Sequence, residues 1–126
     1  MLAVQGGGLS EGTDYEWNIL SAIAVVGLPL APPNLEVKAL VGHFVSKFGD
    51  ERGNLYGYTA PALNKVVQSA GRLIRSERDR GVVVLMDERF AQARYKSFLP
   101  PEMQPEIIGS QEDLVAEIGH FFKKNR

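Results

Sequence analysis

The sequence has no cysteine and only two histidines among its 126 residues. Without cysteine, the chain has no disulfide framework, no thiol nucleophile and no cysteine-ligated zinc or iron–sulfur site. His43 and His120 lie far apart and form no His-x-x-x-His pair, so we do not expect a zinc enzyme or any other metal site. The sequence also has no excess of charge of one sign. With 14 Lys+Arg against 15 Asp+Glu, the net charge of −1 argues against a wholly basic nucleic-acid module but not against a local basic site.

Long hydrophobic runs are missing as well. The longest, residues 19–31, is shorter than the roughly 20 residues that a membrane-spanning helix needs, and Pro29 interrupts it. The N-terminus shows no basic segment followed by an apolar one, which is the pattern of a secretory signal. We therefore expect a single soluble, intracellular domain over residues 1–126 with no membrane partner.

Three short apolar runs predict buried strands, at residues 2–5, 21–28 and 81–86. The second run is apolar on both faces, which is typical of a central parallel strand. Helical patterns occupy the gaps, as parallel crossovers require. The sequence therefore predicts an α/β fold with a mainly parallel sheet between helices.

Three segments show helical patterns. Residues 34–48 carry an apolar stripe, which predicts the first helix. A glycine-containing loop is predicted over residues 49–58. Thr59 then begins a second helix, which has Pro61 in its first turn and extends to about Arg75. Ser110 is predicted to cap a terminal helix. The apolar face of that helix consists of Leu114, Ile118, Phe121 and Phe122.

Three strands are fewer than the five or so of a typical sheet. The first predicted strand also begins directly at the N-terminus. We therefore expect the later part of an α/β domain, as a cloned fragment or a truncated gene product. Its first strand would be an open edge through which copies could associate.

A glycine-rich segment over residues 6–15 follows the first predicted strand. It is not a dinucleotide fingerprint, because Glu11 stands where the third glycine is needed. It is not a Walker A loop either, because Thr13 and Asp14 stand where that loop has lysine and a hydroxyl residue. The residues alone leave two interpretations: a turn whose backbone approaches a ligand, or a purely structural strand-to-helix turn.

A second segment places Gln68, Arg72 and Arg75 within roughly 60° of one another on one helix face. Two arginines one turn apart, beside an amide, are suited to surrounding a polyphosphate. The alternative is a solvated basic face. The opposite face is predicted to pack on the sheet through Leu63, Val67, Ala70 and Ile74.

In this order, the two segments resemble motifs V and VI of superfamily-two helicases, most closely those of the XPD/DinG group. The Gly-x-x-Ser-Glu-Gly-x-Asp-Tyr pattern of residues 7–15 resembles motif V, and Gln-Ser-Ala-Gly-Arg-Leu-Ile-Arg at residues 68–75 resembles motif VI. Val-Gly-Leu-Pro at residues 26–29 and Asp-Glu-Arg-Phe at residues 87–90 also fit, so the resemblance covers almost the whole chain. Taken alone, Asp87 and Arg89 fit a structural ion pair at least as well as a functional role.

The resemblance implies that the chain is the C-terminal portion of the second of two RecA-like domains. ATP and Mg²⁺ would bind mainly to the N-terminal helicase domain, which is the implied partner. Arg72 and Arg75 would act as arginine fingers on the γ-phosphate, and Gln68 would orient the phosphate or the attacking water. An iron–sulfur cluster is frequent in this group, and its cysteines would belong to the parent outside this chain.

For motif V, the resemblance implies that Gly12 and Asp14 sit at the nucleotide cleft. Gly8 and Ser10 would hold phosphate oxygens of single-stranded DNA. The implied parent is an ATP-dependent DNA helicase with 5′ to 3′ polarity, active in DNA repair, cytoplasmic or nucleoid-associated.

The chain alone has no Walker A lysine and is expected to be inactive. Two other interpretations remain: a stand-alone, non-catalytic remnant that binds nucleic acid or a partner, and an unrelated phosphate-binding protein.

Overall fold

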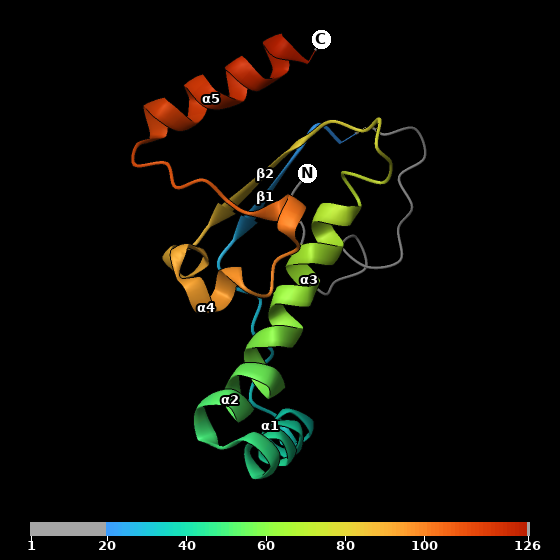
Figure 1. The fold of residues 1–126 in the computed structure, drawn as a ribbon, viewed down its shortest axis with the longest axis vertical. Helices are drawn as coiled ribbons and strands as arrows, with labels where there is room; N and C mark the ends of the chain where they lie inside the picture. The colour runs from blue at the N-terminus through green and yellow to red at the C-terminus, as the bar shows by residue number, and fades with distance from the viewer. Residues whose placement is uncertain (1–19, 126) are drawn as a thin grey trace.

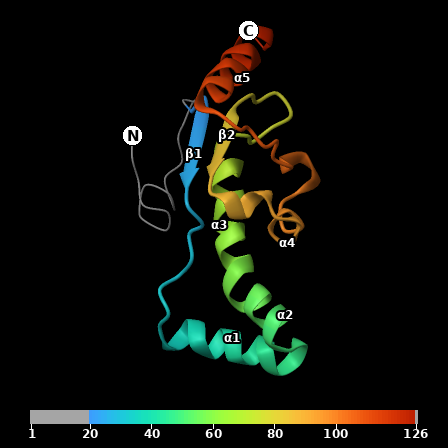
Figure 2. The same ribbon diagram turned by 90° about the vertical axis from the view of Figure 1, so that its left-hand side faces the viewer.

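The computed structural model describes residues 20–125 (Figures 1 and 2). The predicted strand at residues 2–5 and the glycine-rich segment at residues 6–15 lie outside this range. In chain order the elements are β1 (Ala22–Val26), α1 (Leu35–Phe48), α2 (Asp50–Asn54), a π-helical turn (Leu55–Thr59), α3 (Ala60–Gly71), β2 (Val82–Met86), a 3-10 turn (Glu88–Ala91), α4 (Ala93–Lys96), a second 3-10 turn (Pro101–Met103) and α5 (Gln111–Lys124).

The sheet confirms the predicted α/β class, because β1 and β2 are parallel neighbours in register from Ala22 opposite Val82 to Val26 opposite Met86. The chain between them includes α3, which runs back along the sheet (Figure 2). This arrangement is that of part of a RecA-like domain. Within residues 20–125 the sheet has two strands.

In the part of the chain that the structure describes, one face of β1 is covered and the other is open. Val25 is 4% exposed, whereas its neighbour Val26 is 80% exposed. The prediction that this run is buried on both faces is therefore wrong for the described part of the chain. Alternate side chains of a strand point to opposite faces, and among the described residues only the face toward α3 has a helix packed on it.

The core lies between α3, the sheet and the turns after β2. Leu63, Val66 and Leu73 are fully buried. Val67 packs at the edge of this core and Ala70 is buried, as predicted, but Ile74 is 42% exposed because α3 has already ended. The remaining buried apolar residues are Val25, Leu28, Ala62, Phe90, Tyr95 and Leu99.

The segment predicted as a loop, residues 49–58, is helical instead. Asn34 caps α1, accepting a hydrogen bond from the Val37 N–H at 2.8 Å, and the chain turns at Gly49 with φ +82°. It then re-enters helix at α2. The glycines that suggested a loop serve packing: a Cβ on Gly53 would collide with the backbone of Val45 in α1.

Helix α3 differs at both ends from its prediction. Thr59 makes no capping hydrogen bond, because the π-helical turn Leu55–Thr59 leads directly into α3. Tyr58 in that turn donates a hydrogen bond from its hydroxyl to the Ala31 carbonyl at 3.0 Å, tying the helices to the segment after β1. The helix ends at Gly71 and not near Arg75.

The terminal helix is confirmed, with the Ser110 hydroxyl accepting from the Asp113 N–H at 3.1 Å. α5 stands at one end of the molecule, opposite the α1–α2 hairpin (Figure 1). Its predicted apolar face is half-buried, and no residue of α5 is fully buried. Across residues 20–125, no helix combines the length and the apolar character that a membrane crossing needs.

Candidate functional site

The C-terminal end of α3 brings together the three predicted motif VI residues. Gln68 lies exposed on the last turn of the helix, and Arg72, half-buried, forms its C-cap. Arg75 lies beyond the helix, so the helical spacing predicted for it is wrong. Its side chain nevertheless folds back toward the helix end, with Nε donating to the Arg72 carbonyl at 3.4 Å.

Asp79 organises the backbone around Arg75. One of its carboxylate oxygens accepts from the backbone N–H groups of both Arg75 and Ser76, each at 2.8 Å. These backbone hydrogen bonds, that of Arg75 first, lower the pKa of Asp79 below its ordinary value. The loop over residues 75–79 is therefore a closed turn, held by a carboxylate at its end.

Sequence reasoning missed this role. The run at residues 76–80 is mixed in sign, which is typical of a solvated loop and does not by itself indicate such a role. The available signal was an aspartate soon after a helix end, since aspartate side chains readily accept local backbone N–H groups. A further arginine strengthens the turn, because Arg80 Nη1 donates to the carbonyls of Glu77 and Asp79 at 2.8 and 2.9 Å.

The approach to the arginines is open on the side of Gly71. A Cβ built on this glycine would meet no atom of the described chain within 4 Å, and its φ is not in the left-handed region. Gly71 is therefore required neither for backbone conformation nor for packing within residues 20–125. It leaves room for a ligand or another backbone beside Arg72.

A second charged group lies at the opposite end of the sheet. Asp87 and Arg89 form a bidentate pair, with Nε to Oδ1 at 2.9 Å and Nη2 to Oδ2 at 2.7 Å. The hydrogen bonds from Arg89 lower the pKa of Asp87 to about 2, and the backbone N–H of Leu28 contributes as well. The structural ion pair considered for these residues is thus present, and it lies within the 3-10 turn that follows β2.

The two charged groups do not form one site. α3 runs antiparallel to the strands, so Arg72 and Arg75 lie where β2 begins, whereas Asp87 and Arg89 lie where β2 ends (Figure 2). The predicted motif V residues are outside the described range, so their positions relative to the arginines stay predictions. These residues are Gly8, Ser10, Gly12 and Asp14.

A family model described as a helicase C-terminal domain matches residues 1–106. The chain belongs to this family. It is 33% identical over 101 residues to an ATP-dependent DNA helicase DinG of Photobacterium profundum, covering 79% of this chain and 14% of the relative.

Two further relatives extend the comparison. ATP-dependent DNA helicase CHL1 of Candida glabrata is 31% identical over 134 residues, covering 97% of this chain and 16% of the relative. A protein named 3′-5′ exonuclease DinG, from Staphylococcus epidermidis, is 32% identical over 96 residues, covering 75% of this chain and 10% of the relative. The chain thus spans a small part of the length of these relatives, and the predicted resemblance to DinG-type DNA helicases is confirmed.

Proposed function

We propose that this helicase C-terminal domain supplies the motif V and motif VI residues of an ATP-dependent DNA helicase with 5′ to 3′ polarity that acts in DNA repair. Residues 1–126 would be the C-terminal portion of its second RecA-like domain. The observation that carries the proposal is the position of Gln68, Arg72 and Arg75 at the end of α3, where Asp79 closes the turn that carries Arg75.

The donor set at this end suits a phosphate. Two guanidinium groups supply fixed N–H donors and positive charge, and an amide supplies a further donor without charge. The carboxylate of Asp79 accepts two backbone N–H groups and thereby holds the turn that carries Arg75. Arg72 and Arg75 would stabilise the charge on the transferred γ-phosphoryl group of ATP, and Gln68 would orient the phosphate or water.

The motif V residues complete the proposal on the strength of the resemblance. Gly12 and Asp14 would line the nucleotide cleft, and Gly8 and Ser10 would contact the phosphates of single-stranded DNA. Mg²⁺ would be held mainly by the N-terminal helicase domain, since the motif VI end of α3 offers cationic and amide donors and not a set of carboxylates. Closure of the cleft between the two domains would bring the arginines to the nucleotide and couple hydrolysis to movement along DNA.

The test is a chimera in which this chain replaces the matching segment of the Photobacterium profundum helicase. We expect single-stranded DNA to stimulate ATP hydrolysis by the chimera. Arg72→Ala or Arg75→Ala should lower kcat by about 10³-fold or more, because each removes an arginine finger. The isolated chain should show no hydrolysis, since it has no Walker A lysine.

Arg78→Ala is the matched control, because Arg78 is exposed in the same loop and belongs to neither motif. It should keep near-normal turnover. Near-normal turnover in both the Arg72 and Arg75 variants would remove motif VI from the mechanism. Hydrolysis by the isolated chain would place a complete phosphate site within its own residues.

A further inference from the structure

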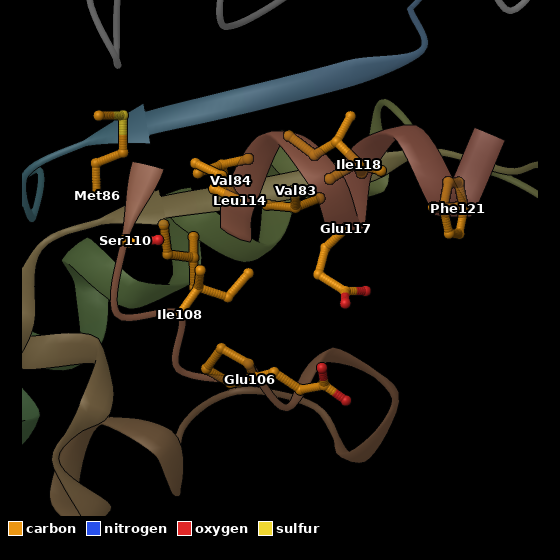
Figure 3. A pocket seen from close by; sticks show the side chains of 13 residues that line it. Val83, Val84, Met86, Glu106, Ile108, Ser110, Leu114, Glu117, Ile118 and Phe121 are labelled. Atoms are coloured by element: carbon orange, nitrogen blue, oxygen red, sulfur yellow. The ribbon is translucent and has the colours of Figure 1, made fainter. Parts of the chain in front are cut away.

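A half-open cavity of about 430 Å³ lies between β2 and α5 (Figure 3). All five residues of β2 line it, from Val82 to Met86. The apolar stripe of the last helix faces it through Leu114, Ile118 and Phe121. A smaller cavity of about 270 Å³ continues past Ile108 toward the 3-10 turn after β2.

The backbone hydrogen bonds of β2 show which of its N–H and carbonyl groups lie at its outer edge. The Val82 N–H donates to the Ser21 carbonyl at 3.1 Å, and the Met86 carbonyl accepts from the Gly27 N–H at 3.2 Å. In a parallel ladder in this register, the backbone groups of alternate residues point to the same side. Val82, Val84 and Met86 therefore face β1, and the N–H and carbonyl groups of Val83 and Leu85 point away from it.

Val83 and Leu85 both line the cavity, and within residues 20–125 no strand pairs with their outward backbone groups. An open strand edge beside an apolar trough is the geometry in which an extended peptide adds as a further strand. Main-chain hydrogen bonds would give such a peptide its register, and the apolar lining would receive its alternate side chains. A helix would leave the backbone groups of Val83 and Leu85 unpaired, so the occupant that fits is a strand.

The charge of the cavity lining indicates which kind of peptide strand would fit it. Every charged residue that lines either cavity is acidic: Asp87, Glu88, Glu106 and Glu117. Asp87 is neutralised by Arg89, but no ion pair within the described chain engages the others. The carboxylates of Glu106 and Glu117 lie on the same side of the larger cavity (Figure 3). A strand with apolar side chains on one face and lysine or arginine on the other complements this lining.

We propose that β2 and α5 form a docking groove for an extended, basic-apolar peptide segment of a partner protein, which pairs with the edge at Val83 and Leu85. The proposal does not depend on the helicase chemistry at Arg72 and Arg75, which lie at the end of α3. It assigns α5 the role of one wall of the groove.

The probe is an acetylated, amidated peptide of sequence KVKVTVKV, titrated into the full ¹⁵N-labelled chain and followed by NMR and amide hydrogen exchange. We expect saturable binding that slows exchange of the Val83 and Leu85 amides by about tenfold or more, since each gains a hydrogen bond. The Val82, Val84 and Met86 amides are already paired with β1 and should change little. The matched peptide EVEVTVEV should bind at least about tenfold more weakly.

The double variant E106K/E117K reverses the charge of the rim without touching the core, since both side chains are exposed. It should weaken the basic peptide about tenfold and bind the acidic one instead. E36K/E51K is the matched control, with the same change in net charge on the distant α1–α2 hairpin. It should bind the basic peptide as the unmodified chain does.

Several results would overturn the proposal. These are no binding of the basic peptide at millimolar concentration, equal binding of both peptides, or binding that leaves the exchange of Val83 and Leu85 unchanged. Protection of these two amides before any peptide is added would show that the chain itself, or a second copy, already occupies the edge. A rise of that protection with chain concentration would identify the second copy as the occupant.

Discussion

At the scale of single residues, two aspartates determine where charged side chains are held. Asp79 closes the turn that carries Arg75, and Asp87 holds Arg89 while capping the 3-10 turn after β2. Backbone N–H groups lower the pKa of Asp79, whereas the Arg89 side chain, followed by its backbone N–H, lowers that of Asp87. In both, the hydrogen bonds stabilise the charged form of the carboxylate. The stability of the chain should therefore depend on acid pH through these two groups.

Asp87 allows the sharper test, because its pKa is about 2 in the folded chain against an ordinary value of 3.8. A carboxyl group whose pKa falls on folding stabilises the fold above its ordinary pKa, and this contribution is lost as pH falls toward 2. Asp87→Asn should lower the free energy of unfolding at pH 7 by about 1 kcal/mol, after allowance for solvent screening around the partly exposed Arg89. The substitution should also reduce the loss of unfolding free energy between about pH 4 and pH 2. Urea unfolding at a series of pH values measures both effects.

Glu88→Gln is the control, because Glu88 is the exposed neighbour and has no ion pair within the described chain. It should leave the acid profile between pH 4 and pH 2 nearly unchanged. An Asp87→Asn chain with the full acid dependence of the unmodified one would show that the pair with Arg89 does not stabilise the fold in solution.

At the scale of elements, the α1–α2 hairpin depends on the close approach of two helices. Gly53 and Gly57 are buried where α2 and the π-helical turn cross α1 at Val45 and Val41. Gly53→Ala should cost about 1–3 kcal/mol in the free energy of unfolding, because the added methyl collides with backbone that a side-chain rotation cannot move aside. Thermal or urea unfolding followed by circular dichroism measures the change.

Gly42→Ala is the matched control within α1. A Cβ at Gly42 meets no described atom within 4 Å, so alanine should stabilise the helix by up to about 1 kcal/mol. The two substitutions should therefore have opposite signs. Equal effects would mean that helix propensity, and not the approach of the helices, determines the stability of the hairpin.

The same hairpin shows how far the sequence predicts elements. Both described strands, α1, and α5 with its Ser110 cap follow from local patterns. The helical structure of residues 49–58 does not follow from them. Glycine occurs both in flexible loops and where two helices pack closely, and the sequence does not distinguish these roles until the partner helix is known. The end of α3 was missed for a related reason: Asp79 competes for the backbone N–H groups of Arg75 and Ser76 from outside the helical window.

At the scale of the whole molecule, the sequence motif predicts which residues form the candidate site but not their geometry. Gln68 and the two arginines follow from their motif, whereas the turn that orients Arg75 depends on contacts that spacing does not encode. The geometry of the proposed cleft between two domains would also depend on both of its walls. The chain spans 14% of the DinG helicase and 16% of the CHL1 helicase that it matches.

Within residues 20–125, β1 has one covered face and one open face. Val26 is 80% exposed and Val25 is 4% exposed, although they are neighbours on one strand. In the isolated chain, Val26→Lys should change the free energy of unfolding by less than about 0.5 kcal/mol, as surface substitutions usually do. Val25→Ala should cost about 2 kcal/mol through lost burial and the cavity it leaves. Urea unfolding of both variants measures the contrast. A cost for Val26→Lys as large as that for Val25→Ala would show that another element covers this face of β1 in solution.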